Sequence, residues 1–525
     1  MDRREFIGGA SALGLAMTID CKPVSAAALP SDITAMSASQ LSLAIRQRQV
    51  TCVEVMQGYL DRIHHYNPVY NAIVSMVDDD ELLRQAELAD LALDKDEYWG
   101  WMHGMPHAVK DLADAKGLET SWGSPIFAGT VATADSLHIA RIRAAGAIFI
   151  GKTNTPEFGL GSQSYNPVHG TTGNAYDPAL TAGGSSGGAA CGMATQMLPT
   201  ADGSDMMGSL RNPGAFNNVI GFRPSQGRVP AIRSGDIFYS QLSTAGPMGR
   251  SVEDTIRLLG TMAGYDPRAP LSMRDSIPSY DGFRREDLGG FRIGWMRDYE
   301  GYLETEPGLL DLCEASLEAL SGHGALVERC RPDFDMERLW QTWLTFRHWA
   351  LGGSRDLYDD PEKRKLLKPE LIWEIEGSFD MPVSRVSEAA VHRSDWYRAL
   401  QAQFQHFDIL ALPTAQVFPF AADVHWPKTI NGRRMDTYHR WMEVVIGGTL
   451  SGLPVVNLPA GFDRDGRPMG MQFIGRMGHD RKVLEFALAY ENVTEYLDRR
   501  PDLVEPHAAR ATTPGSENAL TGRSR

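Results

Sequence analysis

From about residue 104 onward, short apolar runs alternate with glycine-rich turns and helical stretches, and this alternation limits the fold more than any other feature. The runs at 147–150 and 409–412 are two examples. Strands that alternate with helices are typical of an α/β sheet. The segments 455–460 and 469–474 flank a hairpin signal, Asp465-Gly466, so at least one strand pair is antiparallel. We therefore predict an α/β fold with a mixed, mostly parallel central β-sheet covered by helices on both faces.

Two helices are predicted ahead of this region. Ser37 with Gln40, and Thr51 with Glu54, each have the spacing of a capping box, in which two side chains satisfy the free N–H groups at a helix start. The Asn-Pro pair at 67–68 is predicted to end the second helix.

The extreme N-terminus has the pattern of a targeting segment. Arg3 and Arg4 precede an apolar run at 6–19, and small residues follow at 25–28. This order predicts a twin-arginine-type signal peptide at residues 1–27 and a periplasmic or secreted bacterial protein, with a cytosolic tail as the alternative. The apolar run is shorter than the ~20 residues that a transmembrane helix needs, so no integral membrane anchor is expected.

The rest of the chain is predicted to form one domain at 30–495 and a disordered tail at 500–525, which is rich in Ala, Thr, Gly, Ser and Arg. A formal net charge of −15 argues against a nucleic-acid partner. Of the five cysteines, Cys21 lies in the predicted signal peptide and the others lack metal-ligand spacing, so no metal and no cofactor are predicted. The oligomeric state stays open, and a homodimer is compatible with the sequence.

Two motif matches are rejected on physical grounds. Residues 146–153 (Gly-Ala-Ile-Phe-Ile-Gly-Lys-Thr) satisfy the phosphate-loop pattern, but their variable positions are those of a buried strand and not of an open loop. Residues 183–187 fit the Gly-x-Ser-x-Gly nucleophile elbow, yet turn residues at 173–182 stand where that motif needs a strand. Ser185 is instead predicted on a loop that enters a helix.

The Gly/Ser-rich stretch from Gly183 to Arg223, which contains Gly-Ser-Leu-Arg, resembles the hallmark of the amidase signature family. The resemblance also takes in 108–112, 151–158, 453–461 and 470–475, and so covers most of residues 30–495. It implies hydrolysis of an amide by a pair of serines and a lysine.

Carried over position by position, the resemblance makes Ser209 the nucleophile, Ser185 a bridging serine preceded by a cis peptide, and Lys110 the base. A serine hydroxyl must lose its proton to a base as it attacks, and a lysine can serve only when it is neutral. Lys110 ends the apolar run Ala108-Val109, where burial would lower its pKa.

The resemblance places the oxyanion hole on the backbone N–H groups of Met206, Met207, Gly208 and Ser209. Three further residues are expected to support the site, Ser186 and a charge-assisted pair formed by Asp205 and Arg211. The family commonly has a Thr-Gly or similar small pair at Met206-Met207, so two flexible thioethers should narrow the acyl pocket.

These observations predict an exported amidase that cleaves the C–N bond of small apolar or aryl amides through an acyl-enzyme. Two alternatives remain open. The same motifs suit the amide-transferring subunit of a tRNA-dependent amidotransferase, which needs cytosolic partner subunits. They also suit a binding protein that keeps the fold without catalysis.

Overall fold

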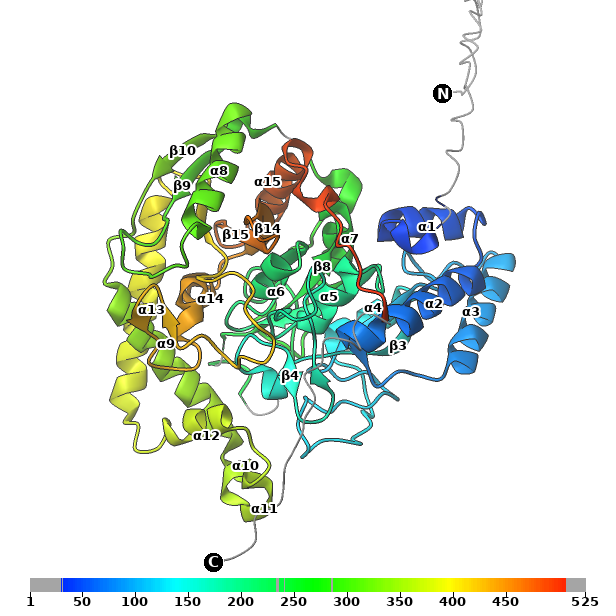
Figure 1. Cartoon of the computed structure of the whole chain (residues 1–525), viewed down its shortest axis with the longest axis horizontal. Coiled ribbons are helices and arrows are strands. Elements are labelled where there is room, and N and C mark those ends of the chain that lie inside the picture. The colour runs from blue at the N-terminus through cyan, green and yellow to red at the C-terminus, as the bar shows by residue number, and fades with distance from the viewer. Residues whose placement is uncertain (1–29, 31, 233–235, 240, 285–286, 507–525) are drawn as a thin grey trace, which may run out of the picture. The chain divides into compact units, whose positions relative to one another are not determined.

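A central sheet of eight strands organises the protein, seen here in a computed structural model (Figure 1). Its strands are β6 (Thr200–Asp205), β7 (Ile220–Arg223), β8 (Thr244–Gly249), β9 (Arg292–Trp295), β10 (Leu326–Arg329), β11 (Ile409–Pro413), β14 (Val455–Phe462) and β15 (Pro468–Ile474). Their order across the sheet is β10-β9-β11-β15-β14-β7-β8-β6. β9 is parallel to β10 and β11, and the other five pairings are antiparallel.

The mixed sheet is therefore confirmed, but its predicted mostly parallel character is wrong. The helix α6 (Arg211–Phe216) joins β6 to β7, and these two strands do run in the same direction. However, β8 lies between them and is antiparallel to both. Alternation of strands and helices along the chain carries no information about a strand that is inserted between two others, and here that strand makes both pairings antiparallel.

Helices cover both faces of this sheet, as predicted. Neighbouring side chains of a strand point to opposite faces. On β15, Gln472 accepts a 2.7 Å hydrogen bond from Arg211 of α6, whereas Phe473 packs against Phe486 of α15. The helix α5 packs with α6, and α7 and α8 pack with α15. The bounds of these additional helices are α5 (Gly187–Ala194), α7 (Val252–Met262), α8 (Leu309–Gly322) and α15 (Asp480–Val493).

A further group of helices lies beside the sheet, between β10 and β14 in sequence. It comprises α9 (Met336–Leu351), α10 (Arg355–Asp359), α11 (Pro361–Arg364), α12 (Pro369–Glu376), α13 (Val383–Gln403) and α14 (Ile446–Ser451). The long helix α13 packs on α9 and α14. Two short strands, β12 (Thr429–Ile430) and β13 (Arg433–Arg434), form an antiparallel pair in the same region.

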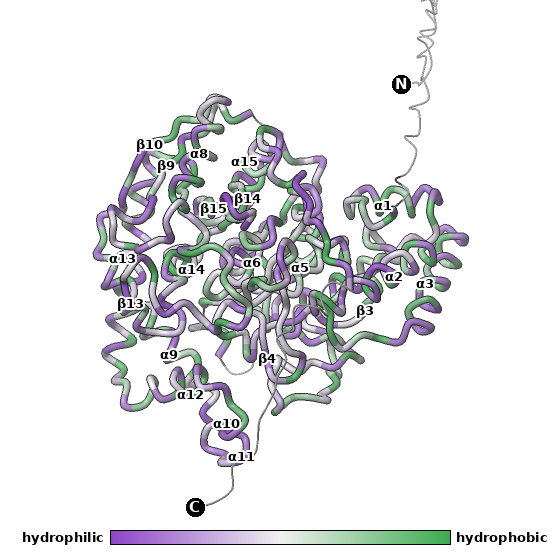
Figure 2. Tube along the Cα trace, in the orientation of Figure 1, coloured by the Kyte–Doolittle hydropathy of each residue, from purple (hydrophilic) through white to green (hydrophobic). Residues whose placement is uncertain are grey.

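The N-terminal helices are α1 (Ala38–Arg46), α2 (Cys52–Tyr70), α3 (Asp79–Asp94) and α4 (Leu137–Ala144). Both predicted capping boxes are present. The helix α2 continues past the Asn-Pro pair to Tyr70, with Pro68 contributing no N–H donor to its last turn. Asn67 closes the following turn by accepting the N–H groups of Ala72 and Ile73. Figure 2 shows hydrophilic and hydrophobic segments alternating along α2 and α3, as expected for helices with one buried face.

A smaller sheet, in the order β1-β3-β2, carries part of the site. Its strands are β1 (Ile73–Val74), β2 (Pro106–Lys110) and β3 (Ile148–Thr153), and a separate pair is formed by β4 (Tyr165–Asn166) and β5 (Gly170–Thr171). All of β3 is buried, including the Gly-Lys-Thr that completes the phosphate-loop pattern. That pattern is a strand, as predicted.

The structure describes residues 30, 32–232, 236–239, 241–284 and 287–506, and those between Asp32 and Pro506 form one compact unit. The predicted signal peptide at 1–27 and residues 507–525 of the predicted tail lie outside the described residues. At the start of that tail, the N–H of Val504 donates to the Tyr70 hydroxyl at 3.0 Å. None of the helices in the described ranges has the length and apolar character needed to cross a membrane.

Candidate active site

Three segments bring the predicted site residues together. Lys110 is the last residue of β2, which packs against β6. Ser185 and Ser186 lie on the loop that enters α5, and the peptide bond between Gly184 and Ser185 is cis, as the resemblance implied. Ser209 lies on the turn between β6 and α6. The loop-to-helix setting predicted for Ser185 is therefore present.

The amine of Lys110 lies at the centre of this site. Its Nζ donates to Ser185 Oγ at 2.9 Å and to Ser186 Oγ at 2.8 Å, and it also contacts the carbonyl and hydroxyl of Ser204. The side chain is buried, and this burial lowers the pKa of Lys110 from its ordinary 10.5 to about 7, although Asp202 and Asp205 act in the opposite direction. A substantial fraction of the amine is thus neutral near pH 7.

The two serine hydroxyls on Lys110 have different surroundings. The Ser186 hydroxyl lies against Gly203 of β6, so closely that a Cβ atom at that glycine would be 2.8 Å from Oγ. The Ser185 hydroxyl faces Gly159, where a Cβ would be 3.5 Å away, next to a cavity wall formed partly by Phe158. Ser186 is therefore enclosed by the sheet, and Ser185 has the more open side.

Ser209 is held beside this pair through its backbone. Its carbonyl accepts a 3.2 Å hydrogen bond from the N–H of Ser186, and its side chain is buried except for a small exposed fraction. Among the described residues, no hydrogen bond joins the hydroxyls of Ser209 and Ser185. The structure thus connects Lys110 to Ser185 directly, and the Ser209 hydroxyl has no hydrogen-bond partner among the described residues. Hydrogen bonds of active sites often form only when substrate binds.

The predicted oxyanion loop requires one correction. The N–H of Gly208 donates to Asp205 Oδ1 at 3.0 Å, so it is not free to bind an oxyanion. The N–H groups of Met206, Met207 and Ser209 have no acceptor among the described residues, and these three remain available. Gly208 has a φ of 80°, whereas neither methionine has a positive φ. The conformation that favours glycine is therefore needed at Gly208 only.

The expected pair of Asp205 and Arg211 holds this loop. Arg211 Nε and Nη2 each donate to the Asp205 carboxylate at 3.0 Å, and both side chains are fully buried. Arg223 also donates to the carbonyl and carboxylate of Asp205. Burial alone would raise the pKa of Asp205, but Arg211 and Arg223 hold it well below its usual range. The ionised carboxylate then accepts the N–H groups of Gly208 and Leu210.

Replacing Arg211 by methionine is expected to lower the free energy of unfolding by about 3 kcal/mol, because it leaves a buried carboxylate without its bidentate partner. Urea unfolding measures the change. Arg355→Met serves as the control, since Arg355 pairs with Asp359 at an exposed position of α10, where loss of a pair costs about 0.5 kcal/mol or less. Equal destabilisation by the two substitutions would refute the structural role given to Arg211.

Asp202 and Ser204 are site residues that the sequence analysis missed. Asp202 Oδ1 accepts the N–H of Lys110 at 3.2 Å and a hydrogen bond from His107 at 3.1 Å. Ser204 contacts the Lys110 amine. Both occupy alternate positions of β6, which places their side chains on the same face. Polar residues at alternate positions of an otherwise buried strand, just before Ser209, were the signal that could have revealed them.

The two methionines do not act alike. Met206 lines a cavity of about 480 Å³ together with Lys110, Trp122 and Phe158, whereas Met207 is buried in the core. Of the two methionines, Met206 therefore lines this cavity and Met207 does not. The Met206 sulfur accepts a 2.7 Å hydrogen bond from Nη1 of Arg347, a residue of α9 that lies outside the sequence motifs.

Comparison with known proteins agrees with this geometry. The Amidase family model matches residues 54–484. An acylamidase of Rhodococcus erythropolis is 30% identical over 470 residues, which span 89% of this chain and 97% of that protein. A subunit of the glutamyl-tRNA(Gln) amidotransferase of Thermosynechococcus vestitus is 31% identical, over 88% of this chain and 99% of its own length.

Among solved structures, a bacterial aryl acylamidase of the amidase signature enzymes superposes with a TM-score of 0.82 and 26% identity, over 88% of this chain and 98% of that one. Fold and site together define an amidase, a hydrolase that acts on carbon–nitrogen bonds. The chain belongs to the amidase signature family.

Proposed function

We propose that the protein is an exported amidase that hydrolyses small apolar or aryl amides through Lys110, Ser185 and Ser209. The observation that carries this proposal is the 2.9 Å hydrogen bond between the Lys110 amine and the Ser185 hydroxyl, at a lysine whose burial lowers its pKa to about 7. A neutral amine in that place can accept a proton, which the charged form cannot.

In the proposed reaction, Ser209 Oγ bonds to the amide carbonyl carbon as its proton passes to Ser185 Oγ, and the Ser185 proton passes to Lys110 Nζ. The carbonyl oxygen becomes an oxyanion on the free backbone N–H groups of the 206–209 turn. The C–N bond then breaks, and the leaving nitrogen takes the proton back through Ser185. Water attacks the acyl ester by the same route, which releases the acid and restores Ser209.

One part of the wall of the cavity beside Lys110 is suited to an apolar or aryl group. Leu112, Trp122, Phe158 and Met206 contribute apolar side chains to its wall. The acylamidase and the aryl acylamidase to which this chain is similar carry activities of the same kind in their names. Arg3-Arg4 and the apolar run at 6–19 support the export part of the proposal, with the periplasm or the cell exterior as the destination.

The amide-transferring subunit of a tRNA-dependent amidotransferase is the second candidate, because several relatives that are about 31% identical over nearly their full length carry the name of such an amidotransferase. A twin-arginine signal argues against it, since such proteins work with cytosolic partners. Hydrolysis of a simple anilide by the purified chain alone would favour the first candidate. The paired Lys110 and Ser185 argue against a binding protein without catalysis.

A fluorophosphonate probe is expected to label the purified protein at one site, Ser209, because a probe of this class reacts with activated serine hydroxyls. Peptide mass spectrometry locates the adduct. Ser209→Ala should not be labelled, whereas Ser186→Ala should be. An adduct that persists in Ser209→Ala would mean that another serine is the nucleophile, and no adduct in the native protein would favour a binding protein.

A further inference from the structure

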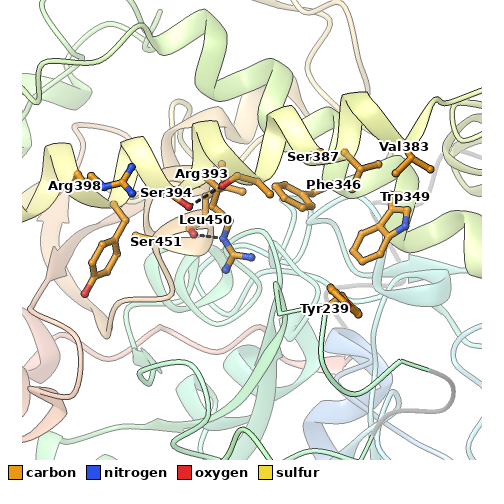
Figure 3. Close-up of a pocket in the computed structure, with 13 residues that line it drawn as sticks. Tyr239, Phe346, Trp349, Val383, Ser387, Arg393, Ser394, Arg398, Leu450 and Ser451 are labelled. Atoms are coloured by element: carbon orange, nitrogen blue, oxygen red, sulfur yellow. Dashed lines mark hydrogen bonds between the residues drawn. The ribbon is translucent and has the colours of Figure 1, made fainter.

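A second cavity, of about 650 Å³, lies between α9, α13 and the end of α14 (Figure 3). Phe346 and Trp349 of α9, Val386 and Ala390 of α13, and Leu450 of α14 contribute to its wall. None of the described residues that line it belongs to the proposed catalytic set. Its volume falls within the ~300–1,000 Å³ that small-molecule sites commonly have. Its largely apolar wall suits a ligand with an aryl or alkyl body.

One side chain of this cavity, Arg393, carries a charge that no acidic group in the described part of the chain balances. Arg393 extends from α13, and its Nε and Nη2 donate to the carbonyls of Leu450 at 2.6 Å and Gln241 at 3.0 Å. Among the described residues, no carboxylate lies within ion-pair distance of this guanidinium, and its Nη1 has no acceptor. Burial lowers the pKa of Arg393. A half-buried cation held only by carbonyl dipoles is an unusual arrangement, because such charges are normally paired.

Two neighbouring arginines differ from Arg393, because each of them is paired with a carboxylate. Arg398 lines the same cavity, but it is exposed and pairs with Asp395 at 2.8 Å. Arg223, which lies close enough to repel Arg393, is already committed to Asp205. The guanidinium of Arg393 also lies 5.8 Å from the centre of the Phe346 ring, so the cation and an aromatic wall share one end of the cavity. An anion with an apolar body would complete this arrangement.

We propose that this cavity binds a small carboxylate with an aryl or alkyl body, the carboxylate on Arg393 and the body against Phe346 and Trp349. A guanidinium is the side chain best suited to a carboxylate, since its planar N–H groups match the two oxygens. The site is separate from the Lys110 cavity and does not depend on the proposed reaction.

The test is isothermal titration of the full-length protein with 4-phenylbutyrate. We expect one binding site that Arg393→Gln weakens about ten- to a hundredfold, the usual effect of losing a charge-assisted hydrogen bond. The alcohol 4-phenylbutan-1-ol has the same body without the charge, and it should bind the native protein correspondingly more weakly. Arg398→Gln is the matched control and should leave the dissociation constant within about twofold, because that charge is already paired.

Ala390→Trp fills part of the cavity and keeps the Arg393 side chain, and it should abolish binding even if Arg393→Gln fails to fold. Thermal unfolding of each variant shows whether it is folded. The proposal is overturned if the native protein does not bind 4-phenylbutyrate, if the alcohol binds as tightly as the acid, or if folded Arg393→Gln and Ala390→Trp bind as the native protein does.

Discussion

Replacing Lys110 by methionine is expected to lower kcat for amide hydrolysis on the order of 10³- to 10⁴-fold, the contribution of a positioned general base. Methionine fills nearly the same buried space, so the fold should remain intact. The loss should appear in kcat, because in the proposed reaction the amine accepts the Ser185 proton while Ser185 takes the proton of Ser209. Steady-state kinetics with an anilide substrate measures it.

Lys152→Met is the control for this substitution. Lys152 is also a fully buried lysine, on the neighbouring strand β3, but its amine donates to the Ala113 carbonyl and the Thr120 hydroxyl. It makes no hydrogen bond to Ser185 or Ser209. Its loss should lower the stability of the fold and leave the kcat of the folded variant within about tenfold of the native value. That change is much smaller than the change expected from losing a general base. Near-normal turnover by Lys110→Met would remove the base from the mechanism.

Ser185→Ala and Ser186→Ala should have very different effects, although both hydroxyls lie within 2.9 Å of the Lys110 amine. Ser185→Ala breaks the proposed path between Ser209 and Lys110, so we expect kcat to fall on the order of 10²- to 10⁴-fold. Ser186→Ala removes a hydrogen bond from an amine that keeps other partners, so we expect less than about a tenfold change. Similar losses in both variants would show that Ser185 has no special role.

Local chemistry explains what the sequence could predict. The capping box at Ser37 and Gln40 and the hairpin around Asp465 depend on residues a few positions apart, and both are present. Asp205 and Arg211, which form an ion pair, are also only six positions apart in the sequence. Lys110 and Ser185 are 75 residues apart, and their contact could be inferred only because a known family shows that pattern.

Features set by long-range packing could not be predicted. The place of β8 between β6 and β7 depends on sheet assembly, and nothing in the α6 segment indicates it. The N–H of Gly208 is engaged because the Asp205 carboxylate turns back toward it, which the backbone path decides. Arg347 contacts Met206 from 141 positions away in the chain. Such contacts determine which N–H groups of the 206–209 turn are free and which side chains surround the turn, and the motifs indicate neither.

The pH dependence of Ser209 acylation tests the account most directly, because it reports the protonation state of the base in the free enzyme. The second-order rate constant for fluorophosphonate labelling is measured between pH 5.5 and 9, in the native protein and in Lys110→Met. Protonated Lys110 cannot accept a proton, so the native rate should fall about tenfold per pH unit below about pH 7 and level off above it. A native rate that does not change with pH, or a Lys110→Met variant that is labelled as fast as the native protein, would contradict the account.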